Sequence, residues 1–351
     1  MIDAETAPDT ADVTDLVRRT LDDFGEATRE AIEAYLQPSR RAPFLDDLMA
    51  DYPRRGGKMM RPTICIANAR VFGGRIEDIV PCAAAVEILH NGLLVHDDIQ
   101  DSSELRRGLP TLHQLHGVPL ALNAGDALIM LALRPLLDGL RRLSPRLADR
   151  ILDATQSMAR ETAEGQALEL GWRDKTGHEV SEADYLAMVL KKTAWMATIW
   201  PAQIGLLVGS QGEADPADVV RFGFFLGAAF QIEDDLRNLA ASATYGKELN
   251  GDLYEGKRTL MLIHARRTAS AADRRTLDGF LGLTREDRTA EGVRWVADLL
   301  RRQGSLEYGR TMAHAMAGAA LHEFNAAYGA LPASRDKAFL GALPAWVFTR
   351  P

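Results

Sequence analysis

The chain has 351 residues, 46% of them hydrophobic, which is enough to bury one large core or two smaller ones. Its formal net charge of −8 argues against a nucleic-acid-binding protein, because such proteins present a basic surface to the phosphate backbone. The two cysteines, Cys65 and Cys82, show neither a disulfide framework nor zinc-site spacing, so we expect a protein of the reducing cytoplasm.

Residues 1–12 are acidic and polar, and we expect them to be disordered. The N-terminus lacks the basic and apolar segments of a secretory signal, so we do not interpret it as one. Helical periodicity then runs through residues 13–351, without a convincing strand pattern or a linker. The sequence therefore predicts a single all-α domain of roughly a dozen helices.

A basic loop is the first motif along the chain, in the segment RGGKMMRP at residues 55–62. Its two glycines permit a tight turn and a close approach of the backbone. Lys58 and Arg61 lie three residues apart and can meet one anion together. A solvated basic turn is the alternative interpretation.

An acidic cluster, Asp97-Asp98-Ile99-Gln100-Asp101, ends the next long apolar run. In a helix, Asp97 and Asp101 share one face and Asp98 lies to the side. Mg²⁺ commonly binds one or two carboxylates together with phosphate oxygens. Arg106 and Arg107 follow closely, so we interpret the segment as a joint metal and phosphate site. A solvated acidic face is the alternative.

A capping box at Ser181–Asp184 predicts a helix from Tyr185 to Trp200. It contains Lys191-Lys192-Thr193, where a lysine more often extends to the surface than meets a ligand. The most apolar long stretch is Ala194–Gly209. It is shorter than a membrane span, so we expect a buried helix and no transmembrane segment.

Asp215-Pro216 predicts the start of a helical run that ends in a second acidic cluster. There Asp234 and Asn238 share a face, Asp235 lies beside them and Gln231 lies one turn earlier. Because an amide adds no charge, we expect weaker metal binding than at the first cluster.

Two glycine–lysine loops follow, at residues 245–247 and 255–259. A further capping pattern at Thr284–Asp287 precedes apolar residues at helical spacing, namely Val293, Val296, Ala297 and Leu300.

From Gly56 to about Ala265, the chain resembles the polyprenyl synthetase family, the trans-isoprenyl diphosphate synthases, and is most like its geranylgeranyl-type members. The matching motifs are GGKMMRP, EILHNGLLVHDDIQDSSELRRGLPTLH, NAGDAL, EGQALEL, KKTA, FQIEDDLRNL and YGKELNGDLYEGKRTL. The resemblance implies the isoprenoid synthase fold, a helical bundle around a central apolar cavity, and a homodimer. It also implies three Mg²⁺ ions and two substrates: isopentenyl diphosphate and an allylic diphosphate (dimethylallyl, geranyl or farnesyl).

The resemblance also implies a role for each matching residue. Metals would be held by Asp97, Asp101 and Asp234, facing one another across the cavity, with Asp98 and Asp235 beside them as catalytic residues. The allylic diphosphate would be held by Arg106, Lys192, Lys247 and Lys257, and the diphosphate of isopentenyl diphosphate by Lys58, Arg61, His90 and Arg107. Thr193 and Gln231 would face the developing carbocation.

The chain departs from the family pattern at two positions. Asn238, which we assign to the substrate-binding residues, stands where the family usually has aspartate. Met59 stands where an arginine is common.

Leu89, Gly92 and Leu93 precede the first cluster and include no aromatic residue, which by resemblance implies a product of geranylgeranyl length or longer. The alternatives are a terpene cyclase, a prenyltransferase to an unusual acceptor, or a non-catalytic partner subunit. Retention of the acceptor-site cations favours chain elongation.

Overall fold

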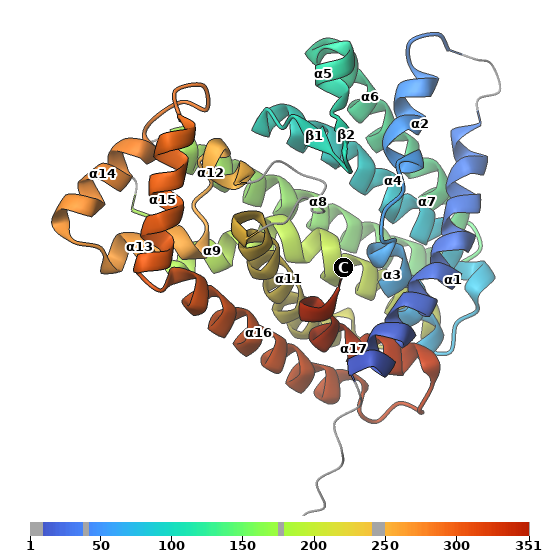
Figure 1. Cartoon of the computed structure of the whole chain (residues 1–351). Coiled ribbons are helices and arrows are strands. Elements are labelled where there is room, and N and C mark those ends of the chain that lie inside the picture. The colour runs from blue at the N-terminus through green and yellow to red at the C-terminus, as the bar shows by residue number, and fades with distance from the viewer. Residues whose placement is uncertain (1–9, 38–41, 175–178, 241–249, 351) are drawn as a thin grey trace, which may run out of the picture.

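The computed structural model describes residues 10–37, 42–174, 179–240 and 250–350, and within these ranges it is helical apart from one small hairpin (Figure 1). The first half comprises α1 (Thr10–Leu36), α2 (Asp46–Arg54), α3 (Met60–Val71), α4 (Ile76–Asp101), β1 (Leu105–Arg106), β2 (Leu109–Pro110), α5 (Leu112–His116), α6 (Val118–Leu131), α7 (Leu133–Leu140) and α8 (Pro145–Asp174). The second half comprises α9 (Glu182–Val189), η1 (Leu190–Ile199), α10 (Trp200–Gly209), η2 (Pro216–Val219), α11 (Val220–Ala240), α12 (Gly251–Glu255), α13 (Leu260–Thr268), α14 (Ala271–Leu281), α15 (Ala290–Arg302), α16 (Ser305–Tyr328) and α17 (Arg335–Thr349). The predicted all-α class is confirmed.

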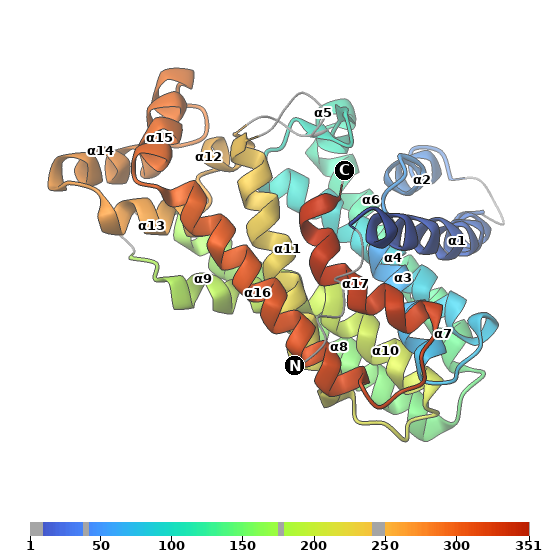
Figure 2. The same cartoon turned by 60° about the horizontal axis from the view of Figure 1, so that its bottom comes forward.

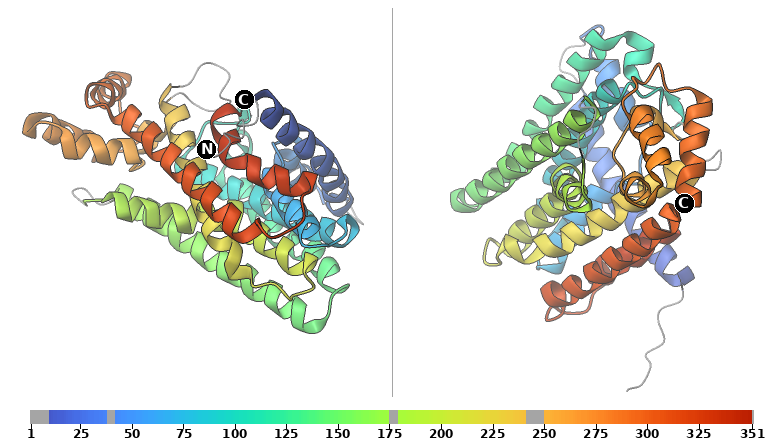
Figure 3. Two further views of the ribbon diagram at one scale, coloured as in Figure 1. Left: turned by 90° about the horizontal axis from the view of Figure 1, so that it is seen from below. Right: turned by 90° about the vertical axis from the view of Figure 1, so that its left-hand side faces the viewer.

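The two helices that carry the acidic clusters are central to the packing. α4 packs against α1, α3, α6 and α7, and α11 packs against η1 and α16. Figure 2 shows α13 to α15 at one end of the molecule and α1, α2 and α6 towards the other. In Figure 3, α17 lies beside α1, which agrees with the contacts between these two helices.

Most of the predicted helix starts are confirmed. Ser181 forms a capping box with Asp184, and Asp215 accepts a hydrogen bond from the backbone of Ala217 at the start of η2. The start predicted at Thr284 is wrong, because the side chain of Thr289 caps α15 instead. That threonine directly precedes the buried face of Val293, Val296, Ala297 and Leu300.

Two further expectations need correction. Thr10 already lies in α1, so the predicted disorder does not extend to residue 12, while residues 1–9 lie outside the described residues. The hairpin β1–β2 was not predicted, because its paired strands have only two residues each.

The segment η1 is a π-helix, a wider turn that often marks functional sites. Helix α8 lies unusually close to it at Gly165. A Cβ on that glycine would lie 2.2 Å from the backbone nitrogen of Lys192. The contact therefore requires glycine, and it fixes the face of α8 beside Lys192.

Two stretches are apolar and long enough to cross a membrane by length and composition, Ile76–Asp101 and Val118–Leu140. In α4, 67% of the apolar window is buried, as expected of a core helix. In the second stretch only 39% is buried, so α6 and α7 leave apolar surface uncovered in the single chain.

Candidate active site

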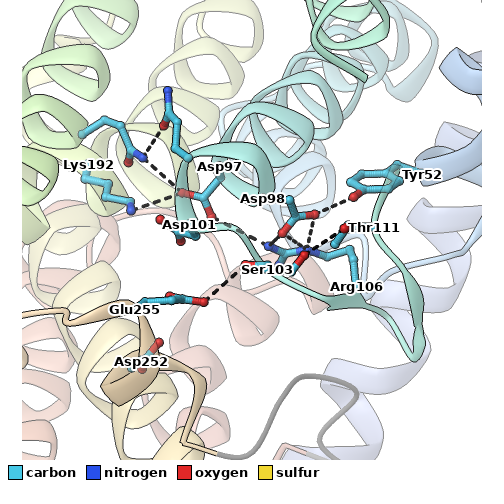
Figure 4. A network of polar contacts seen from close by, with 12 residues as sticks. Tyr52, Asp97, Asp98, Asp101, Ser103, Arg106, Thr111, Lys192, Asp252 and Glu255 are labelled. Atoms are coloured by element: carbon cyan, nitrogen blue, oxygen red, sulfur yellow. Dashed lines mark hydrogen bonds and ion pairs between the residues drawn. The ribbon is translucent and has the colours of Figure 1, made fainter. Parts of the chain in front are cut away.

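The first acidic cluster lies at the end of α4 and lines a hollow, with Asp97 and Asp101 on its wall (Figure 4). The same hollow is lined by Asn238 from the end of α11 and by Asp252, Glu255 and Lys257. The structure thus confirms that Asp97 and Asp101 project together. It also brings the ends of the two cluster-bearing helices to one place.

Asp98 points away from this hollow and is completely buried. The hydroxyl of Tyr52 donates to Asp98 at 2.5 Å, and Arg106 Nε donates to both carboxylate oxygens at 3.1 Å. Burial and the neighbouring Asp98 raise the pKa of Tyr52, so its hydroxyl stays protonated. Asp98 therefore anchors the end of α4, and its assignment as a catalytic residue stays a prediction.

The role of Arg106 at the allylic diphosphate stays a prediction. Its guanidinium is paired with Asp98, and its Nη2 lies 3.8 Å from Asp97. Arg106 lines the hollow while it holds the first cluster through Asp98.

Cations surround the two aspartates that line the hollow. Lys192 Nζ lies 3.3 Å from Asp97, and Asp101 contacts Arg173 at 2.7 Å and Lys257 at 3.1 Å. Lys192 and Lys257 are thus located at the first cluster, and their assignment to the allylic diphosphate stays a prediction. Lys191, which precedes Lys192 in the chain, pairs with Glu161 and Glu164 and, among the described residues, with no cluster aspartate.

Lys257 also pairs with Glu255 at 2.5 Å and with Asp252 at 3.3 Å. Burial, opposed by Lys257, raises the pKa of Glu255 to about 7. Acidic side chains outnumber basic ones in the lining of the hollow, where Arg106 and Lys257 are the two cations among the described residues.

In the second cluster, as in the first, one aspartate is buried and its neighbour is more exposed. Asp235 is buried and accepts from Tyr185 at 2.8 Å and from Gln231 at 2.7 Å. Thr193 donates to Gln231 at 2.8 Å, so the two residues assigned to the carbocation are neighbours. Asp235 has an anchoring role like that of Asp98, and its catalytic assignment stays a prediction.

Asp234 is about half exposed and pairs with Arg350 at 2.5 Å. It is not among the residues that line the hollow. The guanidinium of Arg350 also lies over the ring of Phe230, at 4.6 Å from its centre. Asp234 therefore lies outside the lining of the hollow, and Arg350 holds its carboxylate in this structure.

Asn238 has a structural role that the sequence did not predict. Its side-chain oxygen accepts from the backbone nitrogen of Asp252 at 3.1 Å, and its carbonyl accepts from Asn250 at 3.1 Å. Its assignment to substrate binding stays a prediction, and its amide oxygen is engaged in fixing the start of α12. It thereby places the Asp252 carboxylate in the hollow.

The basic loop lies where the predicted acceptor residues meet. Gly56 has φ of +82°, a conformation that favours glycine, and a Cβ on Gly57 would lie 2.9 Å from Arg107 Nη2, at the flexible end of that side chain. Arg107 Nη1 donates to the carbonyl of Tyr52 at 2.7 Å, and Lys58 Nζ lies 5.6 Å from the ring centre of Trp346.

Charges interact strongly around this loop. Burial, together with Arg61 and Arg107, lowers the pKa of His90, so His90 is neutral and can offer only hydrogen bonds. Burial raises the pKa of Glu87, which Arg61 and Arg107 oppose. Glu87 is a buried acid that our sequence interpretation missed.

Met59 does not face the acceptor loop, because it is buried. Its side chain lies against Gly25 of α1, where an added Cβ would be 3.2 Å away. At this position the chain therefore has an apolar side chain that packs against α1 and adds no cation to the acceptor loop.

The three residues assigned to chain length face two different surroundings, and their role stays a prediction. Leu89 and Leu93 are partly buried within the core, as residues lining a cavity would be. Gly92 instead faces α6, where a Cβ would lie 2.9 Å from Ile129 and 3.0 Å from the carbonyl of Gly125. Lys247, assigned to the allylic diphosphate, lies outside the described residues.

Several residues around the hollow were given no role from the sequence. The two anchoring tyrosines carry no local signal, because their partners are 46 and 50 residues away. For α8 a signal existed: Gln166, Glu169 and Arg173 have i, i+3, i+7 spacing on one helix face.

The donor atoms at the hollow suit a hard divalent cation, since Asp97, Asp101 and Asp252 offer only oxygen. The described residues contain no group of three or more His, Cys, Asp or Glu side chains close enough to hold a metal alone. Mg²⁺ usually completes its octahedron with water and phosphate. The residues present therefore fit a metal that is shared with a phosphate-bearing ligand.

Comparison with known proteins gives a consistent result. Residues 42–300 match the polyprenyl synthetase family. The chain is 32% identical to a short chain isoprenyl diphosphate synthase of Methanothermobacter thermautotrophicus, covering 87% of this chain and 89% of that protein. It is 34% identical to a geranylgeranyl diphosphate synthase of Sulfolobus acidocaldarius, covering 74% and 77%. A polyprenyl synthase from Caulobacter crescentus, crystallised with calcium and isoprenyl diphosphate, superposes with a TM-score of 0.84 at 26% identity, over 96% of this chain and 98% of that one.

Proposed function

Because this chain belongs to the polyprenyl synthetase family, we propose that it is a Mg²⁺-dependent enzyme that condenses an allylic diphosphate with isopentenyl diphosphate. It is a trans-polyprenyl diphosphate synthase by its family and its relatives. The observation that carries the proposal is the hollow at the ends of α4 and α11, where two ligand aspartates meet Lys192 and Lys257.

Asp97, Asp101 and Asp234 would hold the metal, and three ions are the number implied by the resemblance. When bound, Mg²⁺ would stabilise the negative charge that develops on the departing diphosphate. The calcium and isoprenyl diphosphate of the Caulobacter crescentus structure support a divalent cation and a diphosphate at a site of this kind.

The chain's own cations complete the electrostatic stabilisation of the leaving group. Lys192 and Lys257 now pair with Asp97 and Asp101, and they can transfer to diphosphate oxygens when metal takes those carboxylates. The acidic neighbours raise the pKa of both lysines despite burial, so both remain charged donors.

The acceptor site would use Lys58, Arg61 and Arg107 as charges and neutral His90 as a hydrogen-bonding group. Thr193 and Gln231 would present their oxygen atoms toward the positive charge on the allylic carbon. Attack by the double bond of isopentenyl diphosphate forms the new carbon–carbon bond, and a proton then leaves to the departed diphosphate. The apolar helices exclude water that would quench the cation.

We assign a product of geranylgeranyl length or longer. No aromatic side chain stands at Leu89 or Leu93 to close the cavity early. The Sulfolobus acidocaldarius relative, a geranylgeranyl diphosphate synthase, supports this length.

We further propose that the protein is a cytoplasmic homodimer. Both cysteines are free and buried, as a reducing compartment allows. Large apolar side chains on α5, α6 and α7 are about half exposed in the single chain, namely Leu115, Leu122, Met130, Leu133 and Leu137. A second copy would cover this face. Light scattering during gel filtration tests the dimer, and a monomeric mass would contradict it.

One assay tests the activity. Purified protein is incubated with Mg²⁺, labelled isopentenyl diphosphate and each allylic primer in turn, and the products are resolved by mass. Elongated diphosphates of geranylgeranyl length or longer are expected. Farnesyl diphosphate as the final product would refute the length, and hydrocarbons released from the primer alone would favour a terpene cyclase.

A further inference from the structure

We infer that Arg173 is a positioning residue of the first metal site, which orients Asp101 and offsets its charge. This inference rests on the proposed function, since it deepens the role of the same site. Arg173 lies in the last turn of α8 and belongs to neither acidic cluster nor to any of the basic motifs.

The guanidinium of Arg173 has two partners, one at each terminal nitrogen. One arm, Nη1, donates to Asp101 Oδ1 at 2.7 Å, and the other, Nη2, pairs with Glu169 one turn earlier on α8. The Arg173 side chain is only 10% exposed. A planar guanidinium can make two such contacts at once, which an ammonium group cannot do with the same geometry.

Glu169 links this arginine to the rest of the site. Its carboxylate pairs with Lys192 at 2.9 Å as well as with Arg173, and Lys192 in turn contacts Asp97. Burial opposes the charge on Glu169, but Lys192, Lys257 and Arg173 lower its pKa to about 2, so it stays ionised. One buried carboxylate therefore holds two cations, each of which touches a different ligand aspartate.

The two oxygens of Asp101 have different partners. Arg173 occupies Oδ1, and Lys257 lies 3.1 Å from Oδ2. Lys257 is the cation assigned to the diphosphate, so its departure frees Oδ2 for metal. Arg173 is tied to Glu169 and remains on Oδ1. It thereby selects which oxygen binds metal and which direction the carboxylate faces.

With this arrangement, the loss of Arg173 should raise the affinity for metal but lower the turnover. Removing its charge leaves the site more negative and frees Oδ1 of Asp101, while Lys257 stays on Oδ2, so divalent metal should bind more tightly when no substrate is present. Removing its contact also leaves Asp101 without a fixed orientation, so turnover should fall. A residue that only stabilises the fold would not separate these two quantities.

The test compares Arg173→Gln with the wild-type full-length protein. Mn²⁺ binding is measured by electron paramagnetic resonance without substrate, and turnover is measured with saturating Mg²⁺ and both diphosphates. We expect the Mn²⁺ dissociation constant to fall about tenfold, the scale of one neighbouring charge. We expect kcat to fall about 10- to 100-fold, the scale of a small misplacement of a reacting group.

Two further variants separate charge from geometry. Arg173→Lys keeps the charge and loses the two-armed contact, so its metal affinity should stay near wild type while kcat still falls. Arg160→Gln is the matched control, because Arg160 lies on the same helix in an exposed ion pair with Glu164 at 2.8 Å. It should change neither quantity.

A dissociation constant that rises or stays unchanged in Arg173→Gln would overturn the inference, and so would an unchanged kcat. If Arg173→Gln does not fold, Arg173→Lys decides, and wild-type turnover in that variant would overturn it as well. Failure of the proposed function is distinguishable, because it would show as a wild-type protein without condensation activity. The metal-binding measurements do not depend on that activity.

Discussion

Replacing Asp98 with asparagine tests whether this aspartate anchors the first cluster. Its carboxylate is buried between Tyr52 and Arg106. Asparagine keeps the shape and can still accept from Tyr52, but it leaves the buried guanidinium of Arg106 without its main counter-charge. Breaking one side of a buried ion pair costs about 3–5 kcal/mol. For a chain of this size, that loss lowers Tm by roughly 4–7 °C.

Asp97→Asn is the contrasting variant, one residue away on the same helix. The Asp97 side chain is 25% exposed and lines the hollow rather than the core. We expect its Tm to change by less than about 2 °C, as at other sites outside the core. Its kcat should fall by about 100-fold or more, because a group that stabilises charge in the transition state is lost.

The assay is calorimetry of both variants without metal, followed by condensation rates at saturating Mg²⁺. Far-ultraviolet circular dichroism confirms that each variant is folded at the assay temperature. The reasoning would be refuted if Asp98→Asn unfolded at the wild-type temperature, or if Asp97→Asn were the less stable of the two.

The remaining predictions concern the acceptor site, the cavity and the second cluster. Burial and Arg350 lower the pKa of Lys58 to about 8, so KM for isopentenyl diphosphate should rise as pH increases through 8 and the lysine loses its charge. Lys58→Arg stays charged and should flatten that KM profile; a profile like that of wild type would contradict this origin. Gly92→Phe should lower Tm through its clash with α6, whereas Leu93→Phe should shorten the product in a mass-resolved assay. If both variants shortened the product equally, Gly92 would line the cavity, contrary to its contact with α6. Arg350→Gln removes the cation on Asp234 and should lower the Mn²⁺ dissociation constant measured without substrate; an unchanged constant would mean that this pair does not compete with metal.

Local periodicity was sufficient to predict part of the site. The i, i+4 spacing of Asp97 and Asp101 placed them on one face, and the structure confirms it. The same rule separated Asp98 from them. The nature of its surroundings could not follow from the rule, because Tyr52 reaches Asp98 from α2 and Arg106 from the hairpin.

The positions and partners of side chains that depend on helix packing could not be predicted from the sequence. Which side of α4 carries Gly92 is settled by α6, whose backbone lies against it. Arg350 reaches Asp234 from 116 residues away. Asn238 was expected to act as a weak ligand, and only the fold of α12 shows that its oxygen is engaged by Asp252. Spacing within one helix is encoded locally, whereas contacts between helices depend on how the whole bundle packs.

The glycine between α8 and η1 has a consequence for anyone who redesigns this protein. At Gly165 the two backbones touch directly, with no room for even one added carbon. The distance between the two backbones that carry Glu169 and Lys192 is therefore set by main-chain contact, and a side chain at position 165 would widen it. A transplant of this charge network into another helical scaffold would need to carry the glycine with it, since copying the charged side chains alone would reproduce the chemistry at the wrong spacing.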